Sequence, residues 1–177
     1  MEALTLAHVL ISLVAIASGF VAVFGMLGSN RMGGMTALFL ATTVLTSATG
    51  FIFFPLKPFL PSHVTGIISL AVLAIALYAL YARGLVGGWR TTYVVTATLA
   101  LYLNFFVLIV QSFLKIPALK AMAPTQAEPP FLVAQLAGLL GFIALGTFAV
   151  KCFHPERVGG GGTSGPGLKA RSAGSGR

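Results

Sequence analysis

The sequence contains no aspartate, and its acidic residues are three glutamates, Glu2, Glu128 and Glu156. Charged residues of both signs make up 8% of the chain, whereas soluble domains contain about 25%. With so few charges, a soluble fold would have to expose a surface made almost entirely of hydrocarbon. The scarcity of charge therefore excludes an ordinary soluble protein and predicts an integral membrane protein.

Several features of enzymes and metal sites are also missing. The chain has a single cysteine, Cys152, which excludes an internal disulfide. No two glutamates lie close together in the sequence, so there is no carboxylate pair for acid–base catalysis. The motifs of serine hydrolases, zinc proteases and phosphate-binding loops are absent. We therefore expect a non-enzymatic protein without a metal-ion site.

Apolar residues make up 57% of the chain and gather in five stretches. Each stretch is close to the roughly 20 residues that a helix needs to cross a hydrocarbon core. Backbone groups in lipid have no water to bond, so spanning segments of this kind must be helical. We predict an all-α integral membrane protein, with a five-helix transmembrane bundle over residues 1–157. The predicted spans cover residues 4–27, 35–54, 63–82, 92–114 and 131–150.

Two segments lie outside these spans. Residues 158–177 are rich in glycine and serine with scattered basic residues, which predicts a flexible tail without a packed core. The longest loop runs from Lys115 to Pro130, and Ala118 to Met122 in its middle fit a short helix over the mouth of the bundle. A plain connector is the simpler interpretation of this loop, because loop length alone is weak evidence for a lid.

The basic residues are distributed unevenly between the two sides of the predicted bundle. Lys57, Lys115 and Lys120 fall on one side. The other side has Arg31, Arg83, Arg90, Lys151, Arg157 and the basic residues of the tail. The positive-inside rule therefore predicts an external N-terminus and a cytoplasmic C-terminus. Charges shared among loops form no compact basic face, so we expect the lipid bilayer and not nucleic acid as partner. The absence of organellar or secretory signals favours a bacterial inner membrane.

Small and polar residues mark the faces on which the helices are expected to pack. Helices in lipid associate through close backbone approach and interhelical hydrogen bonds. In the first span, small and polar residues recur at steps of four and three: His8, Ser12, Ala15, Gly19 and Ala22. We predict Ala15, Gly19, Gly138 and Asn104 as helix-packing positions. Asn104 lies near the bilayer centre, where asparagine more often bonds a neighbouring helix than a substrate.

Polar residues of four spans are predicted to reach one depth in the outer third of the membrane. These are His8, His63, Gln111 and Gln135, and their small neighbours are Ser12, Gly50 and Gly66. A polar or ionisable side chain inside the membrane is by default a candidate functional group. We therefore take these seven residues as the candidate site.

Two histidines on different helices predict a b-type haem with His8 and His63 as axial ligands. The pair resembles the histidine arrangement of small multi-helix membrane cytochromes b. The resemblance covers these two residues and includes no family motif. His8 lies about a turn inside its helix, whereas His63 directly follows the expected cap Ser62. The two rings are therefore expected to differ in depth by several Å before helix tilt is considered.

Three other interpretations remain open at this stage. Both histidines are compatible with ordinary interfacial positions, where His63 reaches water and His8 bonds a neighbouring helix. A histidine with Gln111 or Gln135 would also suit the headgroup of a quinone or another small amphiphile between helices. Without any cofactor, the chain would be a structural or accessory subunit that uses its small-residue faces to bind a membrane-protein partner or a second copy of itself.

Overall fold

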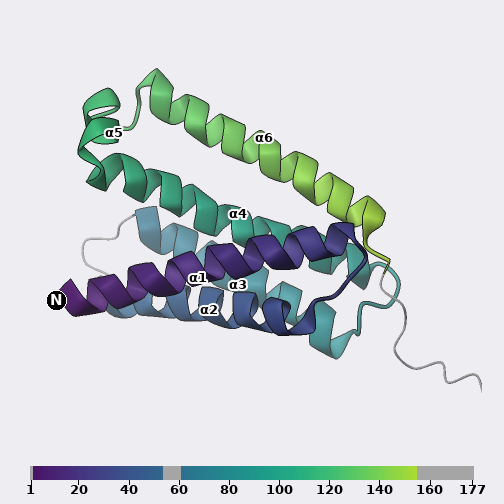
Figure 1. The fold of residues 1–177 in the computed structure, drawn as a ribbon. Helices are drawn as coiled ribbons and strands as arrows, with labels where there is room; N and C mark the ends of the chain where they lie inside the picture. The colour runs from purple at the N-terminus through teal and green to yellow at the C-terminus, as the bar shows by residue number, and fades with distance from the viewer. Residues whose placement is uncertain (1, 54–60, 155–177) are drawn as a thin grey trace, which may run out of the picture.

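A computed structural model describes residues 2–53 and 61–154 (Figure 1). The side chains of residues 2–5, 51–53 and 61–63 are outside this description. Within the described part the chain is helical and contains no strand. The elements are α1 (Glu2–Leu27), α2 (Gly33–Phe53), α3 (Pro61–Leu77), the π-helical turn η1 (Tyr78–Ala82), α4 (Trp89–Lys115), α5 (Pro117–Met122) and α6 (Pro129–Cys152). The predicted tail, residues 158–177, lies outside the described residues, as do Lys57 and Glu156.

Four helical segments are long and apolar enough to cross a membrane, which is typical of a multi-pass membrane protein. They are Leu6–Leu27, Val64–Ala82, Trp89–Lys115 and Pro129–Cys152. The second predicted span also forms a helix, α2, but α2 is not among these four. Threonine, serine and glycine lie among the apolar residues of α2, and the side chains of its last residues, 51–53, are outside the described part.

The helices lie alongside one another with α4 in the central position (Figure 1). α4 contacts α1, α3, η1, α5 and α6. The main contacts of α6 are with α4 and α1. One end of the bundle, here called the α5 end, has the N-terminus of α1 and the short helix α5 (Figure 1). The opposite end, here called the Arg31 end, has the α1–α2 loop, the loop after η1 and the C-terminus of α6.

The main core lies where α1, α2, α3 and α4 meet. Its most enclosed side chains include Ala15, Val23, Leu101 and Ala97, each fully inaccessible to solvent. α6 joins this core through Phe142, whose ring lies 5.4 Å from that of Phe105 between centroids. A smaller cluster of Phe113, Ala123 and Phe131 ties α5 to the ends of α4 and α6. α6 has the smallest buried share of the four candidate spans, so its outer face is open to lipid.

Polar side chains inside the bundle bond between helices. Asn104 of α4 donates its Nδ2–H to Thr43 Oγ1 of α2 over 3.1 Å. Ser47 of α2 and Ser69 of α3 lie 3.4 Å apart between their hydroxyl oxygens. In lipid such bonds connect helices that have no hydrophobic driving force for association. Thr43 and Ser47 of α2 therefore face neighbouring helices.

The C-terminal part of α3 departs from the regular helix expected over residues 63–82. It widens into the π-helical turn η1, in which the Arg83 N–H donates to the Tyr78 carbonyl over 3.0 Å. Tyr78 packs edge-on against Trp89 with 5.2 Å between ring centroids. The Arg83 guanidinium lies 5.1 Å from the centroid of the Trp89 ring. Side chains of the wider turn and of the residue after it thus pack against Trp89 at the start of α4.

Two contacts hold the C-terminus of α6 at the Arg31 end. Arg90 of α4 donates through Nη1 to the backbone carbonyls of Val150 and Phe153. The backbone N–H of His154 donates to Ser29 Oγ of the α1–α2 loop over 2.7 Å. The last carbonyls of a helix have no partner within the helix and carry partial negative charge. An arginine at this position therefore caps α6.

Candidate functional site

His8 is a half-buried residue of α1 whose ring bonds the neighbouring helix α2. Its Nδ1 atom lies 2.8 Å from Thr49 Oγ1. The single hydroxyl hydrogen of Thr49 is directed back to the Leu45 carbonyl, 2.8 Å away. Thr49 Oγ1 is therefore the acceptor in the contact with His8, and Nδ1 carries the hydrogen. In a neutral imidazole this leaves the lone pair on Nε2.

Two of the predicted neighbours of His8 lie next to it. A Cβ atom added to Gly50 of α2 would lie 3.8 Å from His8 Cε1, so the ring rests over this glycine. The Ser12 hydroxyl donates to the His8 backbone carbonyl over 2.8 Å. The Ser12 bond stays within α1, so the ring itself is held by Thr49 and by the surface of α2 at Gly50.

His63, the other predicted ligand, lies in the first turn of α3, and its side chain is outside the described residues. Gly66 follows one turn later, also in α3. α3 begins at the same end of the bundle as α1 (Figure 1). The pairing of the His8 and His63 rings therefore stays a prediction.

The two glutamines lie on helices other than that of His8. Gln111 is exposed on α4. Gln135 of α6 donates its Nε2–H to the Phe106 carbonyl of α4 over 3.4 Å. Its Oε1 atom is buried and has no hydrogen-bond partner in the described part of the chain. His8 is thus bound to α2 and Gln135 to α4, and their meeting around one centre stays a prediction.

The predicted helix-packing residues lie at close contacts. Ala15 and Gly19 of α1 are buried. A Cβ atom at Gly19 would lie 2.6 Å from Leu101 Cδ1, which is closer than real Cβ atoms approach. A Cβ atom at Gly138 of α6 would lie 3.2 Å from Phe105 Cε1 of α4. Gly19 and Gly138 therefore lie where the backbone meets neighbouring side chains closely.

A groove between α4 and α6 is a feature that the sequence did not indicate. It encloses about 470 Å³, and side chains of both helices line it. Thr98 and Tyr102 lie on the α4 wall, and Ile143 and Gly146 lie on the α6 wall. Lys151, close to the end of α6, lines the groove toward the Arg31 end. The groove is thus apolar along its length and cationic at that end.

Thr98 contributes an unusual hydroxyl to this groove. Thr98 is 5% exposed, and its Oγ1 atom has no hydrogen-bond partner among the described residues. Its methyl carbon Cγ2 would lie 3.3 Å from a Cβ atom at Gly146, so the threonine fills the space over that glycine. An unpartnered buried hydroxyl costs about 1–3 kcal/mol. Rotation about χ1 exchanges the hydroxyl and the methyl group, which would let a molecule in the groove accept its hydrogen bond.

The loop between α5 and α6 is fixed by its own hydrogen bonds. Glu128 accepts the Thr125 hydroxyl over 2.8 Å and the Thr125 and Ala127 N–H groups over 3.1 Å each. Desolvation acts to raise the pKa of the Glu128 carboxyl, but these bonds outweigh it and hold the pKa below its ordinary value. Gln126 Nε2 donates to the Val110 carbonyl of α4 over 3.0 Å. The predicted short helix is present as α5, and this loop ties it to the bundle.

Among the side chains that the structure describes, no group of three His, Cys, Asp or Glu is suited to a metal ion. No protein-family model, curated protein or solved structure matches the chain. The site must therefore be interpreted from its own residues.

Proposed function

We propose that this chain is a non-enzymatic, five-span membrane protein in which α2 is the fifth span. α2 has 21 residues, and a helix of that length extends for about 30 Å, the thickness of a hydrocarbon core. It contacts α1 and α3, which both contain candidate spans. Its polar residues Thr43 and Ser47 bond α4 and α3. These bonds reduce the cost of placing the two hydroxyl groups in lipid.

The proposed orientation has the Arg31 end in the cytoplasm and the N-terminus of α1 outside. The described basic residues at the Arg31 end are Arg31, Arg83, Arg90 and Lys151. The α5 end has Lys115 and Lys120, together with the acidic Glu128. An excess of basic residues marks the cytoplasmic side of a membrane protein. We propose the inner membrane of a bacterium as its location.

The proposed ligand at the α5 end is a b-type haem, held by His8 with His63 as the second axial ligand. The observation that carries the proposal is the hydrogen bond of His8 Nδ1 to Thr49 Oγ1. Histidines that bind metals usually donate one ring N–H to a fixed acceptor, which orients the ring and leaves the other nitrogen for the metal. Thr49 has this role for His8. A haem bound there would supply one-electron transfer at the outer face.

We expect detergent-purified protein, expressed with ample haem, to show a Soret band and sharpened alpha and beta bands after dithionite reduction. His8→Ala should abolish these bands because it removes the Nε2 ligand. Thr49→Val should keep His8 as a ligand but remove the hydrogen bond that orients its ring, so haem binding should weaken about 10–100-fold. Visible absorption spectra during haem titration measure each effect.

His154→Ala is the matched control, because His154 is exposed at the opposite end of the bundle. It should leave the spectrum unchanged. A featureless spectrum of the wild-type protein, or unchanged haem binding in His8→Ala, would reject the haem proposal. Circular dichroism of His8→Ala separates ligand loss from misfolding.

A second candidate function is the binding of a small amphiphile of the quinone class in the groove between α4 and α6. Ligand pockets commonly enclose about 300–1,000 Å³ and have apolar walls with a few polar groups. The volume of about 470 Å³ falls in this range, and Thr98 and Tyr102 are among the polar residues along the groove. The unpartnered Thr98 hydroxyl is the specific observation that favours a ligand with a hydrogen-bond acceptor.

Filling the groove should prevent this binding. We expect Ile143→Trp to weaken the binding of decyl-ubiquinone at least ten-fold, as measured by equilibrium dialysis in detergent. Leu140→Trp is the matched control, because Leu140 is also exposed on α6 but does not line the groove. Thr98→Val should weaken binding about five-fold, the effect of one neutral hydrogen bond. Equal affinities in Ile143→Trp and Leu140→Trp would contradict groove binding.

A further inference from the structure

The described basic side chains of the Arg31 end have no acidic partner in the described part of the protein. Glu128 is at the α5 end, and α1 begins at Glu2 at that same end. Arg90 is occupied by the carbonyls of α6, and Arg83 by the ring of Trp89. The Arg31 guanidinium has no hydrogen bond or ion pair with another described residue. It is therefore free to bind an anion from outside the chain.

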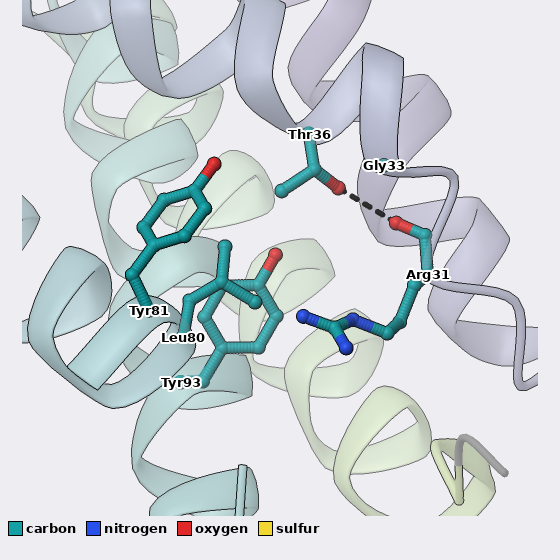
Figure 2. Close-up of a pocket in the computed structure, with 6 residues that line it drawn as sticks. All are labelled: Arg31, Gly33, Thr36, Leu80, Tyr81 and Tyr93. Atoms are coloured by element: carbon teal, nitrogen blue, oxygen red, sulfur yellow. Dashed lines mark hydrogen bonds between the residues drawn. The ribbon is translucent and has the colours of Figure 1, made fainter. Parts of the chain in front are cut away.

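The Arg31 side chain lines a small cavity that has further hydrogen-bond donors (Figure 2). The cavity encloses about 150 Å³, well above the roughly 15 Å³ that one water molecule needs. Figure 2 shows the Arg31 guanidinium and the hydroxyls of Tyr81 and Tyr93 around one space, which Thr36 borders on the α2 side. These side chains come from the α1–α2 loop, η1, α4 and α2. Polar side chains from four segments thus border one space.

The loop that carries Arg31 is fixed in place. The Thr36 hydroxyl donates to the Arg31 carbonyl over 2.8 Å, and the Met32 N–H donates to Asn30 Oδ1 over 3.0 Å. Met32 also lies against α1, because a Cβ atom at Gly25 would lie 2.6 Å from its sulfur atom. The loop backbone therefore needs little reorganisation when a ligand binds, which favours affinity.

The rest of the cavity wall also suits an anion. α2 begins at Gly33, which lines the cavity, and the first N–H groups of a helix carry partial positive charge. Tyr93 is 2% exposed, so the packing around its ring fixes the direction of its hydroxyl. Tyr81 is 64% exposed and lies at the edge of the cavity, open to the surroundings. The Tyr93 hydroxyl is hydrogen-bonded to Thr36, so an anion that enters past Tyr81 would meet Arg31 and the start of α2 as its main partners.

We propose that this cavity binds a phosphate group, and that its natural source is the headgroup of an anionic phospholipid. Arginine binds phosphate oxygens in pairs through its planar guanidinium. The inner surface of a membrane is negatively charged and attracts basic residues close to the ends of spans. The acyl chains would extend from the cavity along the lipid-facing surface. This site is separate from His8 and from the groove between α4 and α6, and its lipid source rests on the proposed cytoplasmic orientation of the Arg31 end.

Native mass spectrometry of the full chain, released from micelles with either phosphatidylglycerol or phosphatidylcholine, tests the proposal. We expect the wild-type protein to retain one phosphatidylglycerol molecule in preference to phosphatidylcholine. Arg31→Gln should weaken that retention at least ten-fold, since it removes a charge-assisted pair of hydrogen bonds. Tyr81→Phe, which removes one hydroxyl at the cavity edge, should weaken it a few-fold.

Arg83→Gln is the matched control, because Arg83 is at the same end but contacts Trp89 and does not line the cavity. It should retain phosphatidylglycerol as the wild type does. Equal losses in Arg31→Gln and Arg83→Gln would overturn the proposal in favour of general attraction between basic residues and anionic lipid. Equal retention of the two lipids by the wild type would overturn it too.

A separate arm distinguishes lipid from free phosphate. Inorganic phosphate is titrated into protein in uncharged detergent without lipid, at constant ionic strength, and thermal stability is followed. Stabilisation by phosphate that Arg31→Gln removes, without retention of phosphatidylglycerol, would assign the site to soluble phosphate and overturn the lipid source. Retention of the lipid with little effect of free phosphate is the expected result. Circular dichroism of Arg31→Gln must match the wild type, and Arg31→Lys should restore part of the binding if the fold is intact.

Discussion

Replacing Gly19 by leucine is expected to prevent stable assembly of the bundle. Even a Cβ atom at this position would lie 2.6 Å from Leu101 Cδ1 and 2.8 Å from Phe39 Cδ2. Both neighbours are buried, at 0% and 1% exposure, so neither side chain has room to move away. Overpacking by single groups in a core costs about 1–3 kcal/mol, and leucine adds three further carbons beyond Cβ. Thermal unfolding in detergent, followed by circular dichroism, measures the loss.

Gly19→Ala should show the same effect on a smaller scale. The clash of its methyl group opposes a gain in helix propensity of about 1 kcal/mol. The control is Gly141→Leu in α6, where no atom lies within 4 Å of an added Cβ. Gly141→Leu should be as stable as the wild type. If Gly19→Leu were also as stable as the wild type, the close approach of α1, α2 and α4 at Gly19 would be wrong.

Replacing Arg90 by methionine is expected to release the C-terminus of α6. The change keeps the apolar stem but removes the donor to the Val150 and Phe153 carbonyls. A hydrogen bond to a charged group contributes about 1.5–3 kcal/mol. The carbonyls at the end of a helix also lose a favourable charge. Hydrogen exchange monitored by mass spectrometry should show faster exchange over residues 150–154, with a lower unfolding temperature.

Arg83→Met provides the comparison for Arg90→Met. Arg83 is exposed and lies over Trp89, where a cation–π contact contributes about 0.5–1 kcal/mol. Its loss should leave exchange at the end of α6 unchanged. Arg90→Lys should recover part of the protection, because lysine keeps the charge without the planar guanidinium. Equal exchange in Arg90→Met and the wild type would mean that Arg90 does not cap α6.

The helices could be predicted from the sequence because the pattern that defines them is local. Runs of apolar residues bounded by glycine and proline gave segments within a few residues of the observed helices, and the short helix at Ala118–Met122 was predicted as well. The π-helical turn at Tyr78–Ala82 could not be predicted. It changes which carbonyl accepts each N–H without interrupting the apolar run, so the composition of that segment carries no sign of it.

The candidate site was harder to predict because it depends on how the faces of different helices meet. The sequence indicated His8 and Gly50, which lie together, but it did not indicate Thr49, which holds the His8 ring. Thr49 is one of several threonines and serines in α2, and which of them faces α1 depends on the rotation of both helices. The same uncertainty applies to Gln135. The sequence indicates its depth along the bundle but not its partner, the Phe106 carbonyl of α4.

The central position of α4 has a consequence for how the protein is made. Chains are synthesised from the N-terminus, so α1, α2 and α3 leave the ribosome before α4, which α1 and α3 contact and to which α2 is hydrogen-bonded. During that interval Thr43 lacks Asn104, its partner on α4. Until α4 is made, α2 is held by its contacts with α1 and α3. A nascent chain halted before Trp89 should therefore contain α1, α2 and α3 without the bond between Asn104 and Thr43, and the arrival of α4 supplies a partner for a side chain made well before it.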